Sequence, residues 1–157
     1  MIKALVSDFS RVLLLPKDKN YLGTLNGLHQ ELSQNPDYKL LNYFELNNEL
    51  LEFYKSLKKK ISMYMFTSET IQDSPELELY LKPVFDKIYS ALKMGVSKKE
   101  PSAYAAIVND LNLAPEEVLY IDDSMVNIEL ALAAGLPALL YKDNESIISE
   151  IKSKLEK

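Results

Sequence analysis

The sequence predicts an α/β fold in three layers, with a central parallel sheet of about five strands between layers of helices. Three observations predict it. Short apolar runs alternate with longer amphipathic segments, which is typical of parallel α/β proteins. The runs are almost continuously apolar, as expected for strands that helices cover on both faces. The 157 residues fit one domain, and their 47% hydrophobic content is enough to build its core.

The predicted strands are the short apolar runs that punctuate the chain. They are Ile2–Ser7, Ile61–Phe66, Lys87–Tyr89, Val118–Ile121 and Pro137–Tyr141.

Four helices are predicted between and after these strands. Leu46–Lys60 carries an apolar stripe and three lysines in its last turn, where cations complement the helix dipole. Pro101–Leu111 begins with proline, which the first helical turn tolerates. Ser124–Ala134 ends at Gly135, which suits a left-handed cap. Ile147–Leu155 follows the last predicted strand.

Residues 16–44 interrupt this alternation. The segment is polar and rich in turn residues, with weak helical character over Leu25–Leu32. It follows the first strand, so we expect an insertion at the carboxyl edge of the sheet, where open α/β sheets bind ligands. We interpret it as a short cap-like insertion within a single domain of residues 1–157. His29 lies on the apolar stripe of the weak helix and is interpreted as a packing or surface residue.

Charge and composition exclude several classes of protein. Lys and Arg total 18 against 23 Asp and Glu, and Arg11 is the sole arginine, which argues against nucleic acid as a partner. The chain has no cysteine, so disulfides, zinc–thiolate sites and thiol nucleophiles are excluded. No run approaches the ~20 apolar residues of a membrane span. We therefore expect a cytoplasmic protein without a membrane partner.

Polar residues follow the first two predicted strands, and a lysine precedes one of the predicted helices. Asp8 comes directly after the first strand, where a carboxylate can act as nucleophile or metal ligand, although alone it reads better as a turn cap. Thr67 and Ser68 follow the second strand and can hold a phosphate, or simply cap a helix. Lys98 precedes the helix at Pro101 and can neutralise a negatively charged substrate, or be one of many solvated lysines.

Asp122 and Asp123 follow the fourth strand as adjacent carboxylates, which repel each other unless a cation or hydrogen bonds compensate. Oxygen ligands of this kind suit Mg²⁺, while an exposed acidic loop is the plain alternative. The combination is more specific than its parts, because a carboxylate, a hydroxyl, a lysine and an acidic pair all fall at one sheet edge.

The order of these residues along the chain resembles the motif order of the haloacid dehalogenase-like hydrolase superfamily, whose fold is Rossmann-like. The segment DFSRV is similar to the first motif, and the strand that ends at Thr67 to the second. GVSKKEPSAY resembles the third, with Lys98 in place and Lys99 where the family has its first proline. YIDDSMVNIELALAAGLPALL closely matches the fourth, including Asn127 and Gly135. The resemblance covers residues 1–15 and about 45–141.

The resemblance implies Mg²⁺-dependent phosphoryl transfer through an aspartyl-phosphate. Asp8 would attack phosphorus and share the metal with Asp123 and the backbone carbonyl of Ser10. Asp122 would either coordinate the metal directly or hold the residues that coordinate it. Lys98 would restrain Asp8.

The same resemblance assigns the phosphoryl oxygens to Thr67 and Lys98, with Ser68 beside them. Arg11 lies near the nucleophile in sequence, where it would contact substrate or stabilise a turn. The substrate would be a small phosphorylated metabolite or a phosphorylated macromolecule, since a small insertion leaves the site accessible. Closure by another subunit of a homo-oligomer is the alternative.

Ser10 departs from the family pattern. The phosphatases of the family carry a second aspartate there, which protonates the leaving oxygen and activates water. Serine is a poor acid near neutral pH, and general acid–base catalysis is typically worth about 10²–10⁴-fold. We therefore expect a slow or specialised hydrolase, acting on substrates such as acyl phosphates that need little acid assistance.

Two other readings stay open from the sequence. A hydrolase that has lost its acid could serve as a binding or regulatory protein that retains the metal set. A dehalogenase-type member needs no general acid. However, such relatives use no Mg²⁺, which leaves the Asp122–Asp123 pair unexplained, and they carry a larger cap than residues 16–44 can form.

Overall fold

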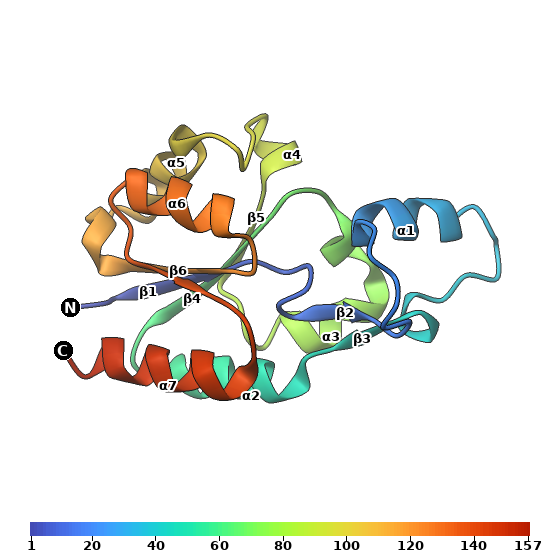
Figure 1. Ribbon diagram of the computed structural model, residues 1–157, viewed down its shortest axis with the longest axis horizontal. Helices are drawn as coiled ribbons and strands as arrows, with labels where there is room; N and C mark the ends of the chain where they lie inside the picture. Colours follow the sequence, from blue (N-terminus) through green and yellow to red (C-terminus); the bar gives the residue numbers. More distant parts are fainter.

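Five parallel strands form the centre of the computed structural model, which describes all 157 residues (Figure 1). Their order is β5-β4-β1-β6-β7, so the first strand lies in the middle and the prediction of a parallel α/β sheet is confirmed. The strands are β1 (Ala4–Ser7), β4 (Ser62–Thr67), β5 (Lys87–Ser90), β6 (Val118–Asp122) and β7 (Ala138–Leu140).

The strand boundaries differ from the predicted ones in a way that concerns the site. The ladder starts at Ala4 instead of Ile2, because Ala4 is the first residue paired with both neighbouring strands. At the other end, Thr67 pairs with Ser90 and Asp122 pairs with Leu140. Both polar residues therefore belong to the strands rather than to the loops after them, and the sheet fixes their backbones.

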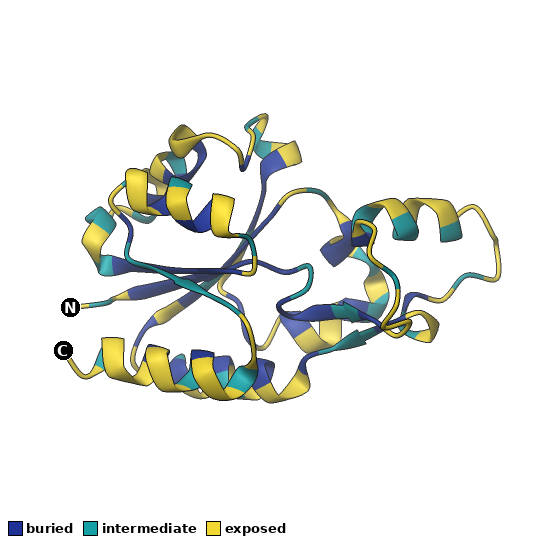
Figure 2. Cartoon of the chain, viewed as in Figure 1, coloured by how far each residue is buried: buried dark blue, intermediate teal, exposed yellow.

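Helices cover both faces of the sheet. Figure 1 shows α5 (Pro101–Leu111) and α6 (Met125–Ala133) on one face and α2 (Asn48–Leu57) and α7 (Asn144–Leu155) on the other. Each layer forms its own apolar cluster against the sheet. Figure 2 shows buried strands between helices whose outer faces are exposed. None of the helices is long and apolar enough to cross a membrane.

The helix ends follow their capping residues. The Asn47 side chain caps α2, accepting from the Leu50 N–H at 3.3 Å. The helix therefore starts at Asn48, and the predicted start at Leu46 was wrong. The lysine triplet lies in a turn beyond the last residue of α2 instead of within it. Asp143 caps α7, accepting from the Ser146 N–H at 2.8 Å, and so α7 starts earlier than predicted. Gly135 adopts a left-handed conformation (φ 90°), as expected.

Short elements escaped the sequence analysis. The helices α3 (Glu78–Leu81) and α4 (Ala91–Met94) have four residues each, which is too few to show helical periodicity. Isolated 3₁₀ turns lie at Ile71–Asp73, Pro75–Leu77 and Pro115–Glu117.

Residues 16–44 leave the core through a two-stranded antiparallel hairpin. Its strands are β2 (Leu14–Pro16) and β3 (Phe44–Leu46). Between them lie α1 (Leu25–Leu32), which matches the predicted helix, and a 3₁₀ turn at Leu40–Asn42. Figure 1 shows α1 standing beyond the carboxyl ends of the central strands.

Side-chain contacts hold this segment against the core. The Gln30 amide donates to the Glu69 carboxylate at 3.0 Å. The Glu76 carboxylate accepts from the backbone N–H groups of Leu40 and Leu41 at 2.8 and 3.2 Å. His29 is half-buried and bonds the Tyr38 hydroxyl at 2.9 Å, which agrees with the packing role expected for it.

Candidate active site

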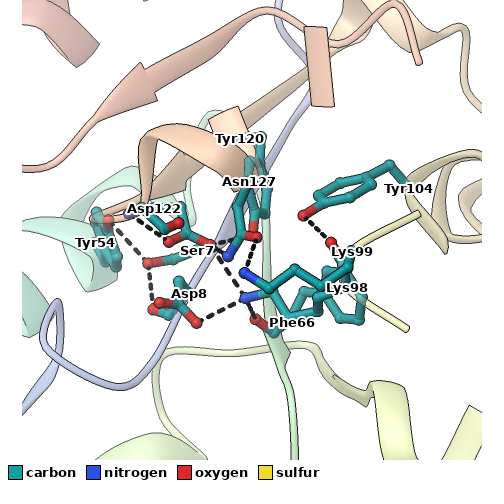
Figure 3. Close-up of polar contacts among 11 residues, drawn as sticks. Ser7, Asp8, Tyr54, Phe66, Lys98, Lys99, Tyr104, Tyr120, Asp122 and Asn127 are labelled. Carbon is teal, nitrogen blue, oxygen red and sulfur yellow. Dashed lines mark hydrogen bonds and ion pairs between the residues drawn. The ribbon is translucent and has the colours of Figure 1, made fainter. Parts of the chain in front are cut away.

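The carboxyl ends of β1, β4 and β6 meet at one cavity of about 210 Å³. Asp8 enters it directly after β1, Thr67 ends β4, and Asp122 ends β6. Lys98 reaches in from the loop before α5 (Figure 3). The structure therefore brings together residues that are far apart in the sequence but share one edge of the sheet. The other predicted site residues line the same cavity: Ser10, Arg11, Ser68 and Asp123.

Lys98 connects the two buried carboxylates. Its Nζ donates to Asp8 Oδ1 at 2.8 Å, to Asp122 Oδ2 at 3.1 Å and to the Phe66 carbonyl at 3.1 Å. Only 5% of Lys98 is exposed, so these three bonds replace water around the ammonium group. Burial lowers the pKa of Lys98, yet the charges of Asp8 and Asp122 outweigh it and raise the pKa. Lys98 is therefore a fixed positive charge between Asp8 and Asp122.

Asp122 is held by donors on both oxygens. Oδ2 accepts from Lys98, from the Tyr120 hydroxyl at 2.5 Å and from the Asn127 amide at 3.0 Å, while Oδ1 accepts from the Ser124 N–H at 2.9 Å. Burial raises the pKa of this carboxyl, but Lys98 and the hydrogen bonds hold the pKa below its usual range. Asp122 is thus a buried anion whose hydrogen-bonding capacity is largely used by the protein.

The pKa of Asp8 is shifted in the opposite direction to that of Asp122. Burial raises the pKa of its carboxyl to about 7, against the attraction of Lys98, and the charges of Asp122 and Asp123 add to the rise. Burial and the neighbouring Asp122 also raise the pKa of Asp123, which is the exposed member of the group. Three carboxylates and one ammonium group leave this site with an excess of negative charge that a cation would relieve.

The donor set fits Mg²⁺. Asp8, Asp122 and Asp123 each offer a carboxylate oxygen, and the three oxygens lie within 4.8 Å of one another. Hard oxygen donors, few in number and open to water on one side, are what Mg²⁺ takes in phosphoryl-transfer sites. Ser10 lines the same cavity.

Comparison with known proteins identifies the family. The sequence model for haloacid dehalogenase-like hydrolases matches residues 11–135, which is most of the chain. The chain belongs to this family. The matched range contains Thr67, Lys98, Asp122 and Asp123, and it begins just after Asp8.

Two known enzymes illustrate the low identity between the chain and its relatives. Bifunctional epoxide hydrolase 2 of Sus scrofa is 26% identical over 121 residues, covering 73% of this chain and 22% of that protein. D-ribitol-5-phosphate phosphatase of Bacteroides thetaiotaomicron is 25% identical over 125 residues, covering 74% and 61%. The chain therefore spans less than two thirds of either relative.

A solved structure agrees in fold. The haloacid dehalogenase-like enzyme of Bacteroides thetaiotaomicron in complex with magnesium and inorganic phosphate superposes with a TM-score of 0.66 at 16% identity. The match covers 94% of this chain and 99% of that one. At this identity the likeness shows the fold alone.

Ser10 leaves the cavity without a carboxyl group where the family resemblance predicts an aspartate. The Ser10 hydroxyl is buried and has no hydrogen-bond partner. The insertion lines the cavity with Thr24, Leu25 and Asn26, none of which is an acid. The only carboxylates in the cavity are the three at the strand ends. Apart from these three carboxylates, the cavity offers a substrate no side chain suited to protonate its leaving group near neutral pH.

Arg11 makes a structural contact. Its guanidinium donates to the carbonyls of Tyr21 and Gly23 at 3.1 and 2.7 Å, which ties the turn after β1 to the loop before α1. Its own backbone is left-handed (φ 62°), as the tight turn requires. Of the two roles expected for Arg11, the structure displays the turn contact.

The hydroxyls at the end of β4 do not cap a helix. The first helical turn after β4 begins at Ile71, and its N-cap, Thr70, makes no side-chain capping bond. Thr67 and Ser68 instead line the cavity beside Lys98. The capping alternative for these two residues is therefore wrong.

Tyr120 is a site residue that sequence reasoning missed, and we expect its hydroxyl to matter for stability. Tyr120→Phe removes a bond to a buried carboxylate and should lower the free energy of unfolding by about 2 kcal/mol. The matched control is Tyr64→Phe on β4, where the half-buried hydroxyl bonds no protein group and the loss should stay below about 0.5 kcal/mol. Urea unfolding measures both, and equal losses would contradict the role given to this bond.

Proposed function

We propose that the protein is a hydrolase of phosphate esters or acyl phosphates that acts through an aspartyl-phosphate at Asp8. The observation that carries this proposal is the Asp8 carboxylate itself. It is held by Lys98 Nζ at 2.8 Å at the edge of the central sheet, next to two more carboxylates. A carboxylate fixed in this way is oriented for attack, and orientation supplies much of the catalysis in phosphoryl transfer.

In the proposed reaction an oxygen of Asp8 attacks phosphorus, and the bond from phosphorus to the leaving oxygen breaks. The leaving group departs with the bonding electron pair. Water then attacks the phosphorus of the aspartyl-phosphate and breaks its bond to the Asp8 oxygen, which restores the carboxylate. One proton of that water stays on the released inorganic phosphate, and the other goes through solvent to the leaving group. Thr67 and Ser68 would bind the phosphoryl oxygens. The three N–H groups of Lys98 already bond Asp8, Asp122 and the Phe66 carbonyl, so Lys98 would keep Asp8 aligned and attract the phosphoryl group through its charge.

Mg²⁺ is the proposed cofactor. Asp8, Asp123 and the Ser10 carbonyl would hold it, and Asp122 would support them, since its oxygens already accept four hydrogen bonds. When bound, Mg²⁺ offsets the repulsion between an anionic nucleophile and an anionic substrate.

We infer that the substrate is a small phosphorylated molecule with a good leaving group. The reaction cavity holds about 210 Å³, and Leu25 is the only hydrophobic residue in its lining. Without a general acid, the leaving oxygen must depart largely unprotonated, which favours acyl phosphates and esters of acidic alcohols. Residues 16–44 would act as the cap, because the start of α1 forms one wall of the cavity.

A non-catalytic role is the second candidate, and Ser10 is the observation that favours it. A protein with this metal set and no acid could bind a phosphorylated ligand without turning it over. Binding of inorganic phosphate that requires Mg²⁺, with no hydrolysis of any phosphate ester, would support this candidate over the first.

Removal of Mg²⁺ tests the proposed function. Hydrolysis of acetyl phosphate and p-nitrophenyl phosphate should fall by at least about 100-fold when the metal is chelated, because the site then keeps its excess negative charge. Adding Mg²⁺ back should restore the rate, while Ca²⁺, which is larger and tolerates irregular coordination, should restore less. Equal rates with and without the metal would contradict the proposal.

A further inference from the structure

A second lysine reaches the site beside the first. Lys98 and Lys99 extend side by side from the same loop (Figure 3), and Lys99 Nζ donates to Asn127 Oδ1 at 3.2 Å. The Asn127 amide in turn donates to Asp122. The proposed reaction assigns a role to Lys98 and none to Lys99.

The charge of Lys99 is not neutralised. Lys98 pairs with two carboxylates, whereas no carboxylate lies within 4.0 Å of Lys99, which takes part in none of the ion pairs. Its one polar partner is a neutral amide. An ammonium group has three N–H donors, so two remain available for a ligand.

Lys99 lines a second cavity, of about 480 Å³, that adjoins the reaction cavity. Ser68 and Lys98 belong to the walls of both. A phosphoryl group bound beside Ser68 and Lys98 would therefore lie where the two cavities meet, and the second cavity is open to its leaving group. The second cavity is about twice as large as the first, so it offers more room to the leaving group.

Glu69 lines the same cavity and limits where an anion can bind. Its carboxylate accepts from Gln30 on α1 at 3.0 Å and makes no ion pair with Lys99. A negatively charged group in this cavity is attracted to Lys99 and repelled by Glu69. It would therefore bind on the Lys99 side, close to the phosphoryl site.

Resting on the proposed function, we propose that Lys99 is a specificity-determining residue that binds a second anionic group on the leaving-group part of the substrate. That group is a carboxylate or a further phosphate, since the point charge of a lysine accepts either. The substrate class is thus a phosphorylated compound that carries another acid, rather than a neutral phosphate ester.

Non-hydrolysable phosphonates test this without relying on turnover. (3-Carboxybenzyl)phosphonate and (3-carbamoylbenzyl)phosphonate have nearly the same shape and differ in one charge. Calorimetry in the presence of Mg²⁺ should find the carboxylate bound roughly fivefold more tightly, as expected for one partly solvated charge pair. A diphosphonate built on the same ring carries a second phosphate-like group in place of the carboxylate. Its affinity, compared with that of (3-carboxybenzyl)phosphonate, shows which of the two anionic groups is preferred.

Variants of Lys99 test whether this residue causes the preference for the charged phosphonate. Lys99→Gln should bring the carboxylate-to-amide affinity ratio to about 1, and Lys99→Arg should keep most of the preference. If Lys99 only positioned Asn127, Lys99→Gln would weaken both phosphonates equally and leave the ratio unchanged. That result, or a ratio near 1 for both charged probes in the wild type, would overturn the inference.

The same experiment separates this inference from the proposed function. Mg²⁺-dependent hydrolysis of p-nitrophenyl phosphate together with a ratio near 1 overturns only the role of Lys99. Absence of binding by every phosphonate overturns the role of Lys99, and it overturns the proposed function as well only if p-nitrophenyl phosphate and acetyl phosphate are not hydrolysed either.

Discussion

Asp8→Asn should reduce hydrolysis of acetyl phosphate and p-nitrophenyl phosphate by roughly 10⁴-fold or more, because the variant lacks the proposed nucleophile. Asparagine has nearly the same shape, and its side-chain oxygen can still accept the Lys98 bond. The loss would therefore report chemistry rather than collapse of the site.

Asp37→Asn is the matched control for this variant. Asp37 is exposed in the insertion, away from the reaction cavity, so the same substitution there should leave the rate and the thermal midpoint unchanged. An Asp8→Asn protein that keeps its rate within about tenfold of the wild type would rule out Asp8 as nucleophile.

Ser10→Asp should raise the hydrolysis of esters with poor leaving groups by about 10²–10⁴-fold, the usual contribution of a general acid. The Ser10 hydroxyl is buried without a partner, and no other acid beyond the three strand-end carboxylates reaches the cavity. A carboxyl placed there would be partly desolvated, which raises its pKa and favours the protonated form that donates. Acetyl phosphate, whose leaving group needs little protonation, should gain much less.

Ser10→Asn controls for size in this experiment. Asparagine resembles aspartate in volume but cannot transfer a proton at neutral pH, so it should give no gain on any ester. If Asp and Asn at this position behave alike, the leaving-group explanation of Ser10 is wrong.

The sheet edge could be predicted because it depends on topology alone. Once the apolar runs are read as parallel strands, their carboxyl ends must share one edge, which brings Asp8, Thr67 and Asp122 together. Lys98 could be predicted as a site residue only through the family resemblance, because nothing in its local sequence distinguishes it from a solvated lysine.

The contacts behind the cavity could not be predicted. Tyr120 reads as one more apolar residue of a buried strand. Its two-residue spacing from Asp122, which places both side chains on one side of the strand, was the available signal. Lys99 reads as a surface lysine, and its direction depends on the path of the loop before α5. The hairpin of β2 and β3 pairs residues about thirty positions apart, beyond the reach of local patterns.

The most direct test of the account is to look for the phosphoryl group on Asp8. The protein is mixed with acetyl phosphate and Mg²⁺, quenched in acid during turnover, digested, and analysed by mass spectrometry. The account predicts a phosphorylated peptide that contains Asp8 in the wild type and none in Asp8→Asn. Turnover without any phosphorylated peptide, or with the phosphoryl group on another residue, would contradict it.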